Sequence, residues 1–145
     1  MELRSGENLS PENTNDKEKR VFKELCLIAL AGAAGTLCRY GLTGVVQSAS
    51  GTRFPWGTLA VNLLGCFLFA FVWGLAEERL VISGRARFVI LTGFMGAFTT
   101  FSTFAYETGE LLRDAQWTLA ACNVAVSNIL GLAGIFLGFA VHRWI

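Results

Sequence analysis

The chain has 145 residues, of which 53% are hydrophobic and only 16% are charged, and its formal net charge is +1. The basic residues are dispersed and do not alternate with exposed aromatic residues, so a nucleic-acid partner is not expected. The sequence contains no His, Cys and Asp cluster with metal-ligand spacing, no paired carboxylates and no phosphate-binding loop. Hydrolytic or redox chemistry therefore has no visible machinery, and we do not expect an enzyme.

The first 21 residues differ in composition from the rest. They are rich in Ser, Asn, Glu and Lys and have no apolar face. They also lack the basic start, apolar stretch and small-residue cleavage site of a signal peptide. Such a segment cannot bury enough surface to offset its ordering entropy, so residues 1–21 are expected to form a disordered polar tail. Residues 22–145 are expected to form a single membrane domain.

The remaining charges are confined to short clusters that separate long apolar runs. Each of the later three runs holds about the 20 residues that a helix needs to cross roughly 30 Å of hydrocarbon. The first run, residues 25–38, is long enough only if the helix accommodates Arg39 and continues to about Val46. The pattern predicts an all-α membrane protein with four transmembrane helices, at about 22–47, 56–76, 86–107 and 116–141.

The distribution of Lys and Arg gives a modest orientation signal. Four spans place both termini and the loop at 77–84 on one side, together with nine of the twelve Lys and Arg residues. The other side holds Arg39, Arg53 and Arg113. The positive-inside rule puts the termini in the cytoplasm. However, four of the nine lie in the tail among acidic residues.

Small residues recur along the predicted helices. Gly134 and Gly138 form a motif that allows close packing of helix backbones, and tight packing is the expected role of most glycines here. The four cysteines all fall within predicted helices, where they are expected to act as small buried hydrophobic residues and not as disulfide partners. They are Cys26, Cys38, Cys66 and Cys122.

Two helices carry uncharged polar stripes. In the second helix Thr58 and Asn62 share a face, and in the fourth helix Asn123 and Ser127 do the same. An amide in hydrocarbon must find partners, and its NH2 group can donate to an anion as well as to a carbonyl. The stripes are therefore either helix-to-helix hydrogen bonds or a lining for an anion.

The third helix contains the most informative segment, residues 93–106, which combines four hydroxyl side chains and two glycines with four phenylalanines. In a regular helix the phenylalanines would form a packing stripe opposite the hydroxyls. Alternatively, the glycines and the pair Thr99 and Thr100 allow a break near the middle of the membrane. A break frees backbone carbonyls, which is tolerated at this depth only where they line a cavity or hold a cation. Phenyl edges could then meet an anion.

Three further polar residues lie near predicted helix ends. Arg39 either reaches the membrane surface or draws anions into a vestibule. Glu107 is expected to close the third helix and face water or a hydroxyl group. His142, the only histidine, is expected at the membrane interface.

The chain resembles the Fluc (CrcB) family of fluoride channels in three motifs: GAAGTLCRY at 32–40, PWGTLAVNLLG at 55–65 and GFMGAFTTFSTF at 93–104. The resemblance covers about residues 25–142. It implies passive, fluoride-selective export from the cytoplasm across the plasma or inner membrane, which limits fluoride toxicity. It also implies an antiparallel homodimer, in which two copies insert into the bilayer in opposite orientations (dual topology), with a break in the third helix and two pathways along the interface.

The same resemblance assigns roles to particular residues. A sodium ion, structural or regulatory, would lie at the dimer centre and bind the backbone carbonyls of Gly96 and Thr99. The fluoride pathway would comprise the amide donor Asn62, the rings of Phe101 and Phe104, and the hydroxyl groups of Thr103 and Ser127. Thr58 and Glu107 would lie near a pore end, and Arg39 would lie in the vestibule. The fourth helix departs from the family pattern, because Gly131 and Ile135 follow Ser127 without a hydroxyl group.

Two other functions are weighed against the channel. A small multidrug-type transporter also has four helices, but it needs an ionisable residue deep in the first helix, and Glu24 lies near the helix start. In a non-transporting membrane scaffold, every polar group would serve only to form contacts between helices.

Overall fold

A computed structural model describes residues 14–77 and 82–144, and all regular secondary structure in this part of the chain is helical. Four segments are long and apolar enough to cross a membrane: 14–50, 56–77, 84–113 and 117–144. The four predicted spans are thus confirmed. The elements in chain order are α1 (Thr14–Ser50), α2 (Trp56–Glu77), α3 (Gly84–Phe88), the π-helical η1 (Val89–Met95), α4 (Gly96–Phe98), α5 (Phe101–Arg113), α6 (Trp117–Val141) and the 3-10 turn η2 (His142–Trp144).

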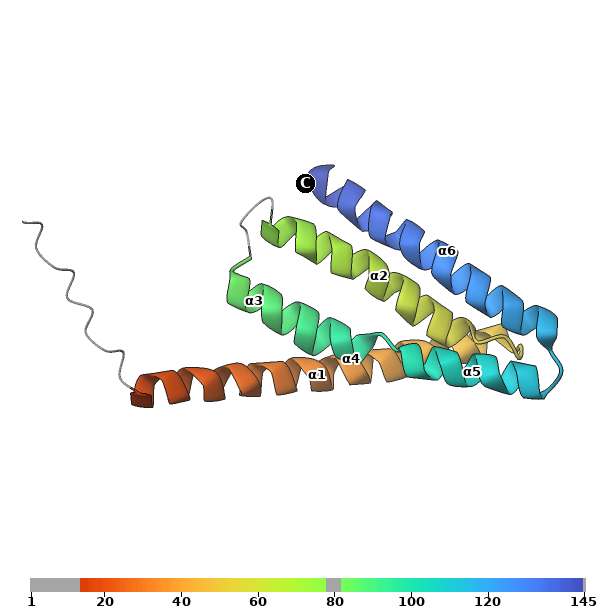
Figure 1. The fold of residues 1–145 in the computed structure, drawn as a ribbon, viewed down its shortest axis with the longest axis horizontal. Helices are drawn as coiled ribbons and strands as arrows, with labels where there is room; N and C mark the ends of the chain where they lie inside the picture. The colour runs from red at the N-terminus through yellow and green to blue at the C-terminus, as the bar shows by residue number, and fades with distance from the viewer. Residues whose placement is uncertain (1–13, 78–81, 145) are drawn as a thin grey trace, which may run out of the picture.

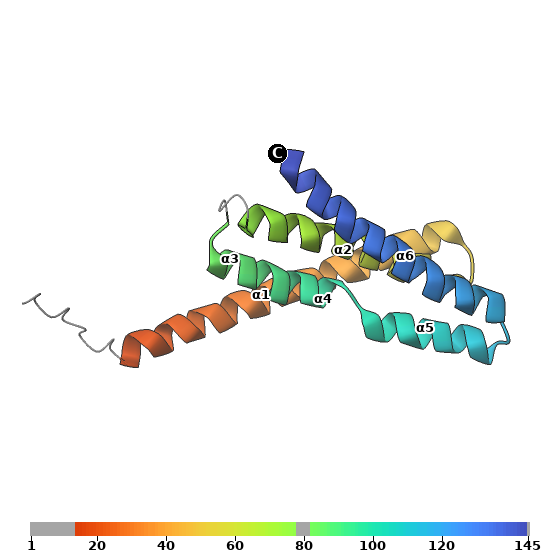
Figure 2. The ribbon, with the colours of Figure 1, turned by 45° about the horizontal axis from the view of Figure 1, so that its top comes forward.

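The helices form one bundle in which α2 contacts the other three spans (Figure 1). Helix α6 lies along α2, and α1 packs against both α2 and the segment from η1 to α4. The start of α1, the start of α3 and the C-terminus lie at one end, and the turn between α5 and α6 lies at the other (Figure 2). This alternation agrees with an even number of spans.

The core lies where α2 meets the third span. Its buried cluster consists of Val61, Leu91, Met95 and Phe98. Helix α6 approaches α2 so closely that a Cβ atom at Gly138 would overlap the carbonyl oxygen of Phe67. The small residue at the end of the Gly134/Gly138 motif therefore serves close packing within the chain, as predicted.

Two predicted boundaries are wrong. Helix α1 begins at Thr14, so residues 14–21 are helical and are not part of an unstructured tail; residues 1–13 lie outside the described part. Lys, Glu and Arg are strong helix formers, and Asp16 in the first turn favours a helix start. The third span continues to Arg113, six residues beyond Glu107, because α5 remains amphipathic and buries Leu111.

His142, which is predicted at the membrane interface, is buried within the chain at the end of the fourth span. Its ring fills the space that a side chain at Gly74 of α2 would need, and it contacts the ring of Phe139 at a centroid distance of 6.3 Å. The missing side chain at position 74 thus determines where the last turn docks.

The cysteines are free, but the prediction that all four are buried is wrong, because Cys26, Cys38 and Cys122 are exposed on this chain. A bundle in lipid requires apolar residues on its outer face as well as inside. A hydrophobic residue in a spanning helix is therefore a poor indicator of burial.

Candidate functional site

The third span is interrupted after Phe98. Thr99 and Thr100 have extended backbone conformations, with φ/ψ of −82°/158° and −149°/114°, and the helix resumes at Phe101. The break occurs within the Gly- and Thr-rich segment, as the sequence predicts. Below, residues 99 and 100 are called the helix break.

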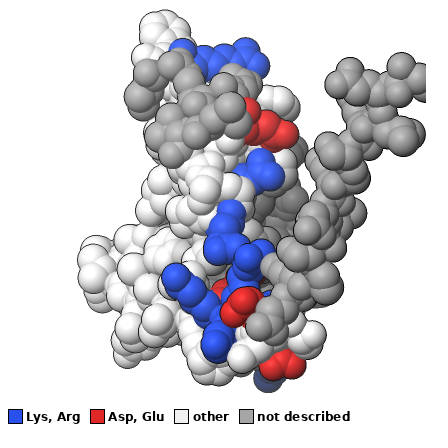
Figure 3. Space-filling model, turned by 90° about the vertical axis from the view of Figure 1, so that its left-hand side faces the viewer, with Lys and Arg blue, Asp and Glu red and all other residues white. Residues whose placement is uncertain are grey.

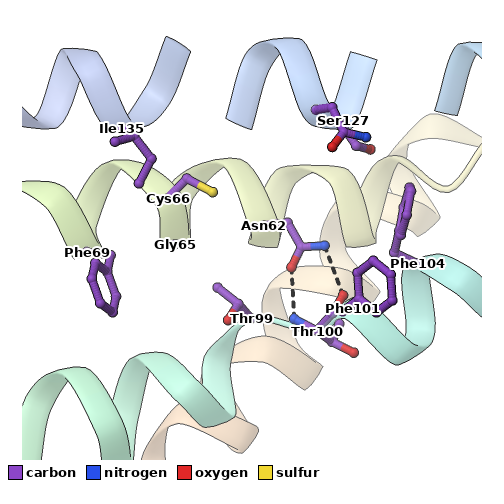
Figure 4. A pocket seen from close by; sticks show the side chains of 11 residues that line it. Asn62, Gly65, Cys66, Phe69, Thr99, Thr100, Phe101, Phe104, Ser127 and Ile135 are labelled. Atoms are coloured by element: carbon purple, nitrogen blue, oxygen red, sulfur yellow. Dashed lines mark hydrogen bonds between the residues drawn. The ribbon is translucent and has the colours of Figure 1, made fainter. Parts of the chain in front are cut away.

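Asn62 of α2 holds this break in place. Its side-chain NH2 donates to the carbonyl oxygen of Thr100 at 3.0 Å, and its oxygen accepts from the N–H of Thr100 at 2.9 Å (Figure 4). One amide therefore replaces both hydrogen bonds that an extended residue would leave unmade in a membrane. The helix-to-helix interpretation of Asn62 is correct for these two bonds, and one of its two amide protons is left over.

The break also changes the surroundings of two carbonyl groups. In a continuous helix the N–H of Thr100 would donate to Gly96, and the N–H of Thr103 would donate to Thr99. Here the first N–H binds Asn62 and the second binds the hydroxyl oxygen of Thr100 at 3.1 Å. The carbonyls of Gly96 and Thr99 thus lose their usual N–H donors, because those N–H groups bind side chains here.

Thr100 has a role that the sequence did not predict, because it was expected only to allow the break as one of a pair with Thr99. It caps the N-terminus of α5, and its hydroxyl donates to the hydroxyl of Thr103 at 2.9 Å. The available signal was a Thr immediately before a resumed helix, which is a favoured N-cap residue. It was masked by the three similar residues around it, Thr99, Ser102 and Thr103.

Gly65 allows the break to sit against α2. A Cβ atom at this position would overlap the side-chain methyl group of Thr99. Thr99 is itself held by its hydroxyl, which donates to the carbonyl of Met95 at 3.0 Å. The close approach of α2 to the break therefore requires glycine.

A cavity of about 340 Å³ lies beside the break, between α2, α5 and α6 (Figure 4). It brings together four of the predicted pathway residues: Asn62, Phe101, Phe104 and Ser127. The two rings lie 5.7 Å apart at 46°. Phe101 is 79% exposed on this chain, so its ring extends beyond the bundle.

Three other predicted residues lie in a second cavity, of about 640 Å³, between α1, α2 and α5. Its lining includes Arg39, Thr58 and Thr103, and Thr100 lines both cavities. Glu107 joins this group because its Oε1 atom accepts from the Thr58 hydroxyl at 2.9 Å. Its Oε2 atom is buried and has no hydrogen-bond partner in the described part of the chain.

The polar stripe of α6 serves mainly as contact with α5. Asn123 is buried and donates to the hydroxyl of Thr108 at 2.9 Å. Ser127 lies 3.5 Å from the Asn123 oxygen and also faces the first cavity. Ile135 continues the wall without a polar group, so the polar lining on α6 is short.

Taken together, these features define a multi-pass helical membrane protein whose third span is broken beside uncharged hydrogen-bonding groups. Residues 26–139 match the family described as CrcB-like protein, Camphor Resistance (CrcB). The chain belongs to this family.

Proteins named fluoride-specific ion channel FluC resemble the chain over most of its length. The one from Nitrosococcus oceani is 58% identical over 123 residues, which cover 85% of this chain and 98% of the relative. The one from Solidesulfovibrio magneticus is 53% identical over 125 residues, 86% of this chain and 100% of the relative. A relative from a Geobacter species is 46% identical over 122 residues, 84% and 98%.

Proposed function

We infer that this protein is a fluoride-specific ion channel, through which fluoride leaves the cytoplasm passively. The observation that carries the inference is the helix break, where uncharged polar groups and two phenylalanine rings line a cavity within the third span. The close relatives named fluoride-specific ion channel supply the identity of the ion.

The pathway is proposed to use donors that carry no full charge. The second amide proton of Asn62 and the Ser127 hydroxyl would replace part of the water around fluoride, and the edges of Phe101 and Phe104 would meet it in the plane of the rings. Conduction requires binding that is favourable enough for the ion to enter and weak enough for it to leave. Uncharged groups meet both requirements better than a buried cation would.

The second cavity is proposed as one end of this pathway. Arg39 would attract anions there, and the Thr103 hydroxyl would lie beside them. Because the Thr58 hydroxyl already donates to Glu107, this pair would orient one another at the pathway's end and not donate to fluoride.

A sodium ion is proposed at the break. Sodium is a hard cation that unwound backbone carbonyls coordinate, and the carbonyls of Gly96 and Thr99 are among those whose helical donors are lost at the break. Bound there, it would offset the negative ends of these dipoles. Two carbonyls leave most of a cation's shell open, so a second copy of the chain would have to supply the rest.

A homodimer is therefore proposed, with the two breaks facing one another and the copies in opposite orientations. The exposed Phe101 ring and the exposed Gly96 support an interface at this face. The modest Lys and Arg bias is compatible with insertion both ways. The cell membrane is the proposed location, since a channel that protects the cytoplasm must lie at its boundary.

Fluoride efflux from vesicles tests the function. Purified protein is reconstituted with potassium fluoride inside, and release is followed with a fluoride electrode before and after valinomycin. A passive channel releases fluoride only once potassium can leave with it. Release without valinomycin would indicate a proton-coupled transporter, and no release in either condition would indicate a scaffold.

A further inference from the structure

We propose that Arg87 forms an anion-collecting site at the outer end of the fluoride pathway, at the end of the bundle that holds the start of α3. The ligand class is a small monovalent anion. This inference rests on the proposed function, because it extends the same pathway from the helix break to the membrane surface.

The first observation is a third cavity that adjoins the cavity at the break. It has a volume of about 400 Å³ and is lined by Phe69 and Trp73 of α2 and by Arg87, Phe88 and Leu91 of the third span, among others. Phe69 lines both this cavity and the one that contains Asn62.

The residues of α2 that line these two cavities share one helical face. Asn62, Cys66, Phe69 and Trp73 follow one another at spacings of four, three and four, which is the repeat of a single face. The two cavities therefore follow one another along the same face of α2, and together they are called the groove. The groove leads from the amide at the break to the guanidinium of Arg87.

The second observation is how Arg87 is held. Its guanidinium carbon lies 4.8 Å from the centroid of the Trp73 ring, and Trp73 is itself stacked on Phe69 at 6.3 Å. A cation–π contact attracts the guanidinium charge but supplies no oxygen acceptor, so its N–H groups can still donate to another partner. No carboxylate in residues 14–77 or 82–144 forms an ion pair with it. The group is thus positioned for an anion but not neutralised.

The third observation is the charge of this end of the molecule. Figure 3 shows basic side chains, with fewer acidic ones between them, on the face that carries the start of α1 and the start of α3. Near Arg87 these include Arg85, and the first turns of α1 contribute Lys19 and Lys23. Such a field raises the local concentration of anions and falls with ionic strength. Arg87 is the one of these residues that lines the groove.

The test compares Arg87→Gln with Arg85→Gln, which removes the same charge two residues away from an exposed side chain that does not line the cavity. Valinomycin-triggered fluoride efflux is measured at about 10 mM and about 1 M ionic strength, where the Debye lengths are roughly 30 Å and 3 Å. We expect Arg87→Gln to lower efflux roughly two- to five-fold relative to wild type at low salt, and to match wild type at high salt. Arg87→Lys should retain most of the rate, and Arg85→Gln should lose less than Arg87→Gln.

Each other outcome rejects the proposal in a distinguishable way. Equal losses for Arg85→Gln and Arg87→Gln would assign the effect to the general surface charge. A loss of the same size at both salts, which Arg87→Lys does not rescue, would assign Arg87 to packing on Trp73. Normal efflux in Arg87→Gln would remove the groove from the pathway, whereas absent efflux in wild type would reject the proposed function itself.

Discussion

The two halves of the third span differ in what holds them. The half before the break, Gly84–Phe98, is wedged between α1 and α2 and buries Leu91, Met95 and Phe98. The half after it, Phe101–Arg113, buries only Leu111 and is tied down by hydrogen bonds through Asn62, Thr58 and Asn123. Phe98 is 3% exposed, whereas Phe101, three residues later, is 79% exposed.

This difference shows which half of the third span is packed mainly within one chain and which half leaves an apolar surface uncovered. Apolar packing fixes the first half within one chain, because Leu91, Met95 and Phe98 are buried against its neighbours. The second half has polar contacts inward and an apolar face outward, so its remaining surface is available to lipid or to another copy. The helix break connects the two halves, and the two hydrogen bonds between Asn62 and Thr100, here called the clamp, hold it in place.

The largest expected effect comes from Asn62→Leu, which removes the clamp. It leaves the N–H and carbonyl of Thr100 without partners, and each unsatisfied group costs about 1–3 kcal/mol. We expect fluoride efflux to fall at least about ten-fold. Asn62→Asp, which keeps an acceptor for the N–H, should unfold at a higher temperature than Asn62→Leu. Equal melting temperatures and normal efflux in both variants would show that the clamp is dispensable.

Gly65→Ala tests the close contact between α2 and the helix break. The new methyl group would overlap the Thr99 side chain, and overpacking of this kind costs about 1–3 kcal/mol. We expect a lower melting temperature and reduced efflux. Gly109→Ala is the matched control, because a Cβ atom there meets nothing within 4 Å. If both variants behaved alike, the close approach at Gly65 would not matter.

Thr100→Ala should have a smaller effect, since it removes the cap of α5 and leaves Asn62 in place. Loss of an N-cap costs about 1 kcal/mol, and Thr100→Ser should restore it. Thermal unfolding in detergent measures the difference. A Ser variant as unstable as the Ala variant would show that the threonine methyl group, and not the hydroxyl, supports the second half.

The smallest change in stability is expected for Phe101→Ile, because the ring is mostly exposed on the chain. We expect unfolding to shift by less than about 0.5 kcal/mol while efflux falls several-fold. Phe136→Ile on α6, where the ring is 71% exposed, is the control and should leave efflux unchanged. Equal efflux in the two variants would indicate that the Phe101 ring contacts lipid and has no part in conduction.

Much of this arrangement could be predicted from the sequence, for identifiable reasons. Runs without charge reveal spans because the hydrocarbon tolerates few charges, and glycines beside paired threonines at membrane depth indicated the break. The role of Thr100 could not be read from the sequence, because it depends on which hydroxyl meets which N–H after the helix opens. The burial of His142 depends on an absent side chain 68 positions away, at Gly74, and no local pattern contains it.

The uncharged groups at the break are proposed to select and pass fluoride. The most direct test of this proposal is the efflux of fluoride against chloride from vesicles of one composition, for wild type and Asn62→Leu. For wild type we predict rapid fluoride release and chloride release no faster than from empty vesicles, and for the variant we predict that the fluoride rate is lost. Chloride released as fast as fluoride, or fluoride release unaffected by Asn62→Leu, would contradict it.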